Sequence, residues 1–199
     1  MNIKFSKEAI EFEKSLSDLD KFTLDFASIL EKQKINYVVV SGYVSILFGR
    51  NRTSEDIDLF IEKISFETFS KLWGELSDAF ECINTSDVKE AYEFYLSAKH
   101  SIRFAKKGQF LPNIELKFPK IELDEWTLKH KVKVIINNKV LYISPLELQI
   151  SFKLTLGTEK DIEDARFLYR LFKNNLDQKL LEEFNRKLKI ESLFKKYIV

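Results

Sequence analysis

Residues 37–62 contain the pattern that most limits how this chain can fold. An apolar, β-branched run predicts a strand, a tight turn and a short helix follow it, and a second strand carries two acidic residues. The segments are, in order, the strand Tyr37–Val40, the turn Ser41-Gly42, the helix Tyr43–Phe48, the polar, basic loop Gly49–Glu55, and the strand containing Asp56-Ile57-Asp58-Leu59.

Asp56 and Asp58 are the first candidates for chemistry. Side chains of a strand alternate between faces, so the two carboxylates project the same way, with Cα atoms roughly 6–7 Å apart. The bare Asp-x-Asp pattern is common, and by itself it favours an ordinary edge strand with two solvated acids. A turn that offers free backbone N–H groups at a helix N-terminus is suited to phosphate. A phosphate cradle followed by two carboxylates favours a site for a nucleotide and a divalent metal ion.

The composition predicts one globular domain, with room for a small satellite subdomain. Of 199 residues, 45% are hydrophobic and 32% charged, and the formal net charge is +1. This balance argues against strong nonspecific coating of nucleic acid. The basic segments Lys129–Lys133 and Arg186–Lys196 leave a local contact with a polynucleotide open, although solvated faces explain them more simply.

The single cysteine, the charged N-terminus and the lack of a long apolar run predict a cytoplasmic protein without a membrane contact. Cys82 has no partner for an internal disulfide, and no stretch approaches the roughly 20 apolar residues of a membrane span. The first 15 residues are too charged for a signal peptide.

Hydrophobic spacing and capping residues predict the remaining elements. Glu115, flanked by apolar neighbours in the second strand of a hairpin, is a candidate third carboxylate. The expected helices are 6–33 with a break near Ser15–Ser17 and Ser17 as N-cap, a helix after Ser65 whose apolar stripe runs to Phe80, Asp87–Tyr95, and Leu123–Lys129. The expected hairpins are Ser101–Ala105 with Asn113–Phe118, and two strands flanking Asn137-Asn138.

The C-terminal quarter is predicted to be helical. Ser144, Pro145 and Glu147 predict a capping box, with a helix that ends at Gly157. Thr158 with Asp161 begins another helix, and two amphipathic segments near 176–187 and 190–197 complete the chain. We place a soft boundary near Ser144, which divides an α/β core (1–144) from a helical subdomain (145–199).

The run from Ser41 to Ile61 resembles the signature of the nucleotidyltransferase (polymerase-β-like) superfamily, and more closely that of the AbiEii-type toxins and related minimal nucleotidyltransferase-like proteins. Two later features extend the resemblance over residues 37–173: the hairpin strand with Glu115, and a Ser-Pro-x-x-Leu…Lys…Lys-Asp-x-x-Asp helix pair. The matching residues are Ser41, Gly42, Tyr43, Val44, Gly49, Arg52, Thr53, Asp56, Ile57, Asp58 and Leu59, with Lys153, Lys160, Asp161 and Asp164 in the helix pair.

The resemblance implies an α/β (α+β) fold, in which a mixed sheet is flanked by helices, and metal-dependent nucleotidyl transfer. Asp56, Asp58 and Glu115 would hold Mg²⁺ or Mn²⁺, and Glu115 alternatively takes the proton of the acceptor hydroxyl. The residues implied for NTP binding are Ser41, Gly42, Arg50, Arg52, Thr53, Lys153, Lys160 and Asp161. Ser41 departs from the usual glycine, which is a strained choice if that position needs a positive φ.

Several of these residues have plainer interpretations. Lys153 is otherwise a solvated helical lysine, one of the arginines otherwise pairs with Glu55 or Asp56, Asp161 is otherwise a cap, and Asp164 is otherwise a surface acid. The favoured function is an enzyme that transfers a nucleotidyl group to RNA such as tRNA, or to a protein. It would be the toxin of a toxin–antitoxin or phage-defence pair, with an antitoxin protein as partner. The alternatives are a degenerate nucleotide-binding or protein-interaction module, and an aminoglycoside-type enzyme with a small-molecule substrate.

Overall fold

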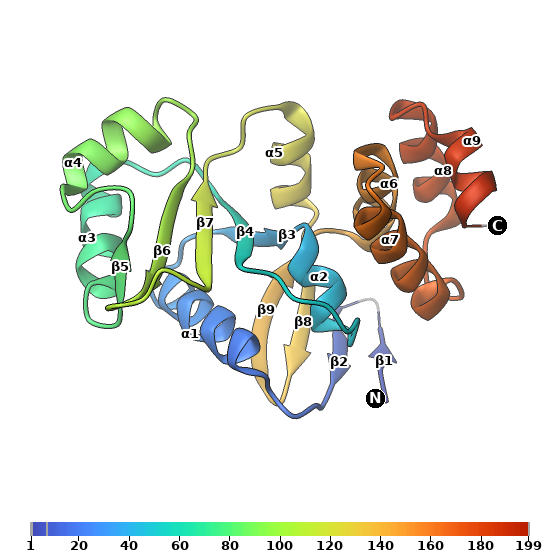
Figure 1. The fold of residues 1–199 in the computed structure, drawn as a ribbon, viewed down its shortest axis with the longest axis horizontal. Helices are drawn as coiled ribbons and strands as arrows, with labels where there is room; N and C mark the ends of the chain where they lie inside the picture. Colours follow the sequence, from blue (N-terminus) through green and yellow to red (C-terminus); the bar gives the residue numbers. More distant parts are fainter. Residues whose placement is uncertain (1, 7, 199) are drawn as a thin grey trace.

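The computed structural model describes residues 2–6 and 8–198, and within them one mixed sheet forms the centre of the molecule (Figure 1). The strand order is β1-β2-β8-β9-β3-β4-β7-β6-β5. The strands are β1 (Lys4–Phe5), β2 (Ile10–Phe12), β3 (Tyr37–Val40), β4 (Asp56–Ile61), β5 (Phe80–Cys82), β6 (Ile102–Lys106), β7 (Asn113–Lys117), β8 (Val132–Ile136) and β9 (Lys139–Ile143). The predicted α/β fold with a mixed sheet is confirmed.

Helices cover the sheet and form one end of the molecule. They are α1 (Asp18–Lys32), α2 (Gly42–Leu47), α3 (Phe66–Leu76), α4 (Val88–Glu90) with the π-helical turn η1 (Ala91–Leu96), α5 (Glu122–Lys129), α6 (Leu146–Leu156), α7 (Glu159–Phe172), α8 (Gln178–Lys187) and α9 (Glu191–Tyr197). The last four pack on one another at the end of the molecule opposite α3 and α4 (Figure 1). No helix within the described ranges is long and apolar enough to cross a membrane.

Alternation along β4 separates the core from the candidate site. Ile57, Leu59 and Ile61 are fully buried, whereas Asp56 is exposed and Asp58 is partly exposed. On the core side, α1 packs against the sheet through Phe22 and Phe26, whose rings lie 5.6 and 5.2 Å from that of Phe80. The apolar residues of β4 thus face the buried core, and the acids are left on the opposite face.

Local signals located most helix ends correctly. The Ser17 side chain accepts a hydrogen bond from the Asp20 N–H, Ser65 accepts one from Thr68, and Thr158 accepts one from Asp161. Gly157 ends α6 with a φ of 70°. Strands β8 and β9 form the predicted hairpin, and Asn137 and Asn138 in its turn both have positive φ.

The sequence prediction was wrong for the first residues. Instead of one broken helix over 6–33, the chain forms the short strand β2 before α1; Lys7 lies outside the described residues. Ile10 and Phe12 are buried while Glu11 between them is exposed, and β2 pairs in parallel with β8. A three-residue alternation is too short to outweigh helical spacing in the sequence, and its partner strand lies more than 120 residues away.

Two other local predictions were also wrong. Phe80, predicted at the end of a helical stripe, belongs to the edge strand β5. Ser144 and Glu147 form no capping box, since Pro145 is the N-cap residue and makes no side-chain cap. The Ser144 hydroxyl instead donates to Gln149 Oε1, and Glu147 Oε1 accepts the N–H of Asp177. Ser144 thus binds a residue five positions further along the chain and Glu147 one thirty positions further, so neither side chain caps α6.

Strands end at Ile143, and the elements from Leu146 onward are helices. This change of structure lies where the sequence predicts the boundary between residues 1–144 and 145–199. The division into two units stays a prediction.

Candidate active site

The three predicted carboxylates lie on two neighbouring strands, and we call Asp56, Asp58 and Glu115 the acid edge. Strand β4 pairs in parallel with β7, and the register places Asp58 beside Glu115 and Phe60 beside Lys117. The side chains of Asp58 and Glu115 are 22% and 17% exposed, so both are largely shielded from water. Residues 57 positions apart in the sequence are thereby brought together on one face of the sheet.

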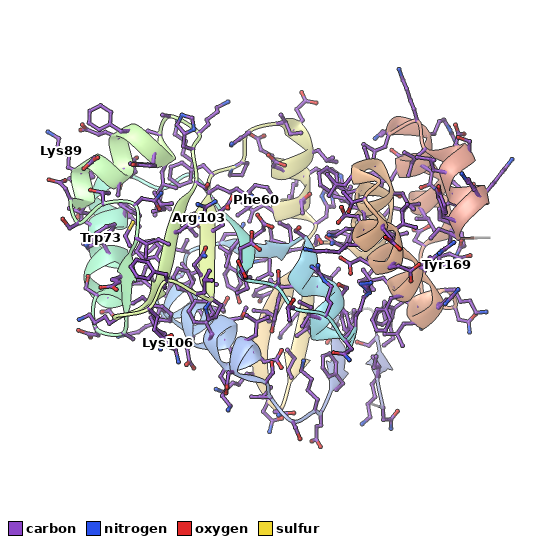
Figure 2. All side chains as sticks on the ribbon, in the orientation of Figure 1. Phe60, Trp73, Lys89, Arg103, Lys106 and Tyr169 are labelled. Atoms are coloured by element: carbon purple, nitrogen blue, oxygen red, sulfur yellow. The ribbon has the colours of Figure 1, made fainter. Side chains whose placement is uncertain are left out.

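Two cations hold the inner part of the acid edge. Lys117 Nζ lies 2.7 Å from Asp58 Oδ1 and 3.4 Å from Glu115 Oε1. Arg103, on the next strand β6, places Nη2 at 3.1 Å from Glu115 Oε2. Figure 2 shows Arg103 and Phe60 near each other, between the α3–α4 end and the α6–α9 end of the molecule. Both oxygens of Glu115 therefore face a positive charge.

These contacts determine the direction of two pKa shifts. Burial raises the pKa of Glu115, but the charges of Lys117 and Arg103 outweigh it, and the net pKa lies below its ordinary value. Burial likewise lowers the pKa of Lys117, and the carboxylates of Asp58 and Glu115 outweigh it, which leaves that pKa raised. Glu115 and Lys117 are therefore both charged at neutral pH.

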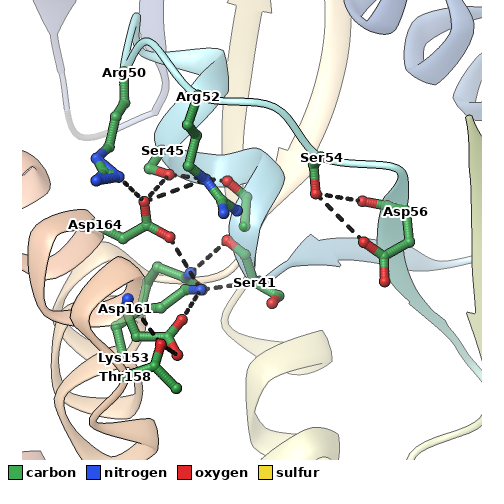
Figure 3. Close-up of polar contacts among 12 residues, drawn as sticks. Ser41, Ser45, Arg50, Arg52, Ser54, Asp56, Lys153, Thr158, Asp161 and Asp164 are labelled. Atoms are coloured by element: carbon green, nitrogen blue, oxygen red, sulfur yellow. Dashed lines mark hydrogen bonds and ion pairs between the residues drawn. The ribbon is translucent and has the colours of Figure 1, made fainter.

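The donor set suits a divalent metal ion in part. Asp56 and Asp58 present carboxylate oxygens on one face, and among the described residues the Asp56 carboxylate has only a weak contact at 3.4 Å, from the Ser54 hydroxyl (Figure 3). Glu115 fits less well because its oxygens are engaged by cations. Among the described residues, no group of three or more His, Cys, Asp or Glu side chains is arranged to hold a metal ion.

Ser41 occupies the turn before α2 in a conformation that suits glycine. Its φ is 63° and its ψ is −138°, a region that side chains with a Cβ avoid. Gln149 of α6 binds both backbone groups of Ser41. Its Oε1 accepts a hydrogen bond from the Ser41 N–H at 3.2 Å, and its Nε2 donates one to the Ser41 C=O at 2.6 Å. The Ser144 hydroxyl donates to the same Oε1 at 2.9 Å. The strained turn is thus fixed by a buried side chain 108 positions away.

Sequence reasoning missed Gln149, Lys117 and Arg103. Gln149 lies in an apolar helix without a motif, and only the packing of α6 against the turn reveals its partner. Lys117 and Arg103 had a weak signal, since each follows the alternation that places Glu115 on its face of the hairpin. The Ser41 N–H, expected to be free for phosphate, is engaged by Gln149.

A second group of charges lies behind the turn, and we call Arg50, Arg52, Lys153, Asp161 and Asp164 the buried ion cluster (Figure 3). Asp164 Oδ1 is 2.7 Å from Arg50 Nη1 and 3.4 Å from Arg52 Nε. Lys153 Nζ is 2.6 Å from Asp161 Oδ1 and 3.1 Å from Asp164 Oδ2. The side chains of Asp164 and Lys153 are 0% and 3% exposed, so the cluster ties the loop after α2 to α6 and α7.

Arg52 also packs closely on Gly42. A Cβ at Gly42 would collide with the Arg52 guanidinium, which packs directly on the turn. Arg52 Nη1 is buried and has no hydrogen-bond partner within the described part of the chain. A buried, unpartnered guanidinium nitrogen at this turn suits an anion.

The remaining predicted residues lie away from these contacts. Thr53 and Lys160 are exposed, on the loop before β4 and on the first turn of α7. Lys153 is not the solvated lysine of the alternative interpretation, and neither Arg50 nor Arg52 pairs with Glu55 or Asp56. Asp161 does take part in the α7 cap, because its N–H donates to Thr158, and it binds Lys153 as well.

A cavity of about 160 Å³ lies beside the acid edge, between the sheet, α5 and α6. Its charged lining residues are Asp58, Lys117 and Asp124. Asp124 Oδ2 already accepts the N–H groups of Lys120 and Ile121 at the start of α5. The uncharged part of the lining is Val40, Ser41, Phe60, Leu123, Thr127, Ser144, Leu148, Gln149 and Phe152.

Comparison with known proteins identifies the fold. No family model matches the sequence, and no curated protein matches it. The chain is similar to the crystal structure of an antigenic nucleotidyltransferase-like protein from Paracoccidioides brasiliensis, with 17% identity and a TM-score of 0.55 over 92% of this chain and 94% of that one. It is also similar to the solution structure of the antibiotic-resistance factor ANT(2'')-Ia, with 10% identity and a TM-score of 0.52 over 90% and 97%. The fold is nucleotidyltransferase-like.

Proposed function

We propose that this chain is a metal-dependent nucleotidyltransferase, which moves a nucleoside monophosphate from an NTP to a hydroxyl group of an acceptor. The observation that carries the proposal is the register of β4 and β7, which sets Asp58 beside Glu115 on the face that also bears Asp56. Three carboxylates on one face of a nucleotidyltransferase-like fold are the residue types that this chemistry needs.

The acid edge holds the reacting groups. Asp56 and Asp58 would hold Mg²⁺ or Mn²⁺, which would neutralise charge on the triphosphate. The acceptor oxygen forms a bond to the α-phosphorus, the bond from that phosphorus to the bridging oxygen of the β-phosphate breaks, and pyrophosphate leaves with the electron pair. The hydroxyl proton passes to a carboxylate of the site, which is Glu115 in the sequence-based assignment.

The buried ion cluster serves the phosphate side. Its two carboxylates and three cations leave an excess of one positive charge next to the Ser41-Gly42 turn. Arg52, with an unpartnered Nη1, is the residue best placed to meet a phosphate oxygen. Lys153 and Asp161 bind each other at 2.6 Å, so we assign them to supporting the arginines and the turn, with Lys160 and Thr53 as outer contacts.

The identity of the acceptor is part of the proposal. We infer an RNA such as tRNA, or a protein, as substrate of a cytoplasmic AbiEii-type toxin with an antitoxin partner; this rests on the sequence resemblance. An aminoglycoside-type substrate is cationic and calls for extra acids around the site. The cavity beside Asp58 adds only Asp124, whose carboxylate caps α5, and it contains the cation Lys117. These charges favour an uncharged or anionic acceptor.

A degenerate binding module is the second candidate. Lys117 and Arg103 neutralise part of the acid edge, and the Ser41 N–H is taken by Gln149. Both features are expected of a fold that keeps its shape without catalysis. The exposed, weakly bonded Asp56 carboxylate favours the enzyme.

Incubation with each α-labelled NTP, Mg²⁺ or Mn²⁺, and total cellular RNA or protein tests the function. We expect label in one acceptor class, and none with Asp58→Asn. The matched control is Asp78→Asn, at an exposed acid after α3. Mn²⁺ with an NTP is expected to raise the thermal midpoint of the wild type and of Asp78→Asn, but not that of Asp58→Asn. Metal and nucleotide binding without transfer under any condition would favour the binding module.

A further inference from the structure

We propose that Lys117 is a built-in cation of the acid edge, so that the site takes one divalent metal ion, on Asp56 and Asp58, and not two. The inference rests on the proposed function and concerns how its charges are arranged. Its basis is the place of Lys117 Nζ between Asp58 and Glu115, at 2.7 and 3.4 Å from their oxygens.

The strand register makes this place a built feature of the fold. Glu115 and Lys117 are two positions apart on β7 and so share a face, and Lys117 lies beside Phe60 in the register. Its ammonium group is 5.4 Å from the centre of the Phe60 ring, and its side chain is 18% exposed. The stem is thus packed at the sheet, and the ammonium is directed to the acids.

A metal ion between Asp58 and Glu115 would need oxygens that are already used. Lys117 contacts Oδ1 of Asp58 and Oε1 of Glu115, while Arg103 contacts Oε2 of Glu115 at 3.1 Å. A divalent cation there would lie next to the ammonium and guanidinium groups in a partly buried place, where like charges repel strongly. The position between these two acids is therefore filled by the protein.

The position between Asp56 and Asp58 is not filled in this way. Asp56 is exposed, and within the part of the chain that the structure describes its carboxylate has one weak contact, from the Ser54 hydroxyl at 3.4 Å. With Asp58 on the same face of β4, it offers an oxygen pair to one metal ion that arrives with the nucleotide. The three carboxylates and two cations carry a formal charge of −1, and one divalent ion reverses it to +1.

Counting bound Mn²⁺ tests the inference without turnover. Electron paramagnetic resonance of free Mn²⁺ is measured in a titration with saturating α,β-methylene analogues of the four NTPs, and the signal of analogue alone is subtracted. We expect one Mn²⁺ per chain for the wild type and two for Lys117→Met, which keeps the stem and removes the charge. Lys117→Gln is the second uncharged variant, with the same expected count. Lys133→Met, on β8, is the matched control with an expected count of one.

The outcomes separate this inference from the function. Two Mn²⁺ ions in the wild type, or one in both folded Lys117 variants, would overturn the role of Lys117 and leave the proposed enzyme intact. Binding of no Mn²⁺ by any of the proteins would overturn the metal-dependent function, and this inference with it. Circular dichroism and thermal midpoints establish that each variant is folded.

Discussion

The acid edge together with its two cations, Lys117 and Arg103, contains five charged residues, as does the buried ion cluster, and the two groups have net charges of opposite sign. The edge has three carboxylates and two cations on β4, β6 and β7, and the cluster has two carboxylates and three cations from the loop after α2 and from α6 and α7. The edge is partly open to solvent, whereas Asp164 and Lys153 are almost fully buried. A surplus of negative charge near solvent suits a metal ion, and a buried surplus of positive charge suits a phosphate.

Burial also determines how much each group of charges contributes to the stability of the fold. Charges near solvent add little to folding, while a buried ionic group left without its partner is strongly destabilising. The comparison therefore predicts that variants of the acid edge mainly lose activity, and that variants of the buried carboxylates of the cluster mainly lose stability.

Asp58→Asn is expected to have the largest effect on activity. The variant keeps the shape of the side chain but removes a charge from the acid pair, and we expect transfer to fall at least about a thousandfold, or ~4 kcal/mol. The unfolding free energy changes much less, by about 1 kcal/mol, because Lys117 keeps Glu115 as a partner when the Asp58 charge is removed. Labelled-NTP transfer and urea unfolding measure the two quantities. A large loss of stability would show that the edge is structural.

Asp164→Asn is expected to have the largest effect on stability. Asp164 is fully buried and faces Arg50, Arg52 and Lys153, so the variant leaves their charges less compensated. We expect a loss of about 3–5 kcal/mol in the unfolding free energy. Urea unfolding measures it, with Asp58→Asn as the matched Asp-to-Asn control. Equal stability of the two variants would contradict the distinction between the edge and the cluster.

Local patterns predicted much of the fold and part of the site. The strand–turn–helix–strand unit and the caps at Ser17, Ser65 and Thr158 follow from residues a few positions apart, which is why the sequence reveals them. Strand β2 could not be predicted, since its three residues depend on pairing with β8. The same holds for Gln149 on Ser41 and for Lys117 on Asp58, where the partners are 108 and 59 positions apart. The alternation of apolar and acidic residues along the two strands predicted the acids. Only the pairing register of β4, β7 and β6 shows that Lys117 and Arg103 lie beside them.

The two hydrogen bonds between Gln149 and Ser41 act as a clamp on the turn before α2, and a double-mutant cycle tests this clamp. Gln149→Leu removes both hydrogen bonds to the Ser41 peptide and leaves the Ser144 hydroxyl without its acceptor. We expect a loss of about 1–3 kcal/mol in the unfolding free energy and weaker NTP binding. Ser41→Gly, which suits the positive φ, is expected to restore about 1 kcal/mol and part of the affinity in the Gln149→Leu background. Purely additive effects would contradict the clamp.

The pH dependence of the cluster gives the smallest effect. Burial raises the pKa of Asp161, but hydrogen bonds from Lys153 and Thr158 outweigh it, so the pKa in the folded state is below its ordinary value. A lowered folded-state pKa gives stability that is present above the unfolded value of about 4 and is lost as the pH falls through the folded one. We expect wild type to exceed Asp161→Asn by on the order of 1 kcal/mol at pH 7, with the difference shrinking below about pH 4. Urea unfolding across this range measures it, and a difference independent of pH would show that Asp161 acts through its cap alone.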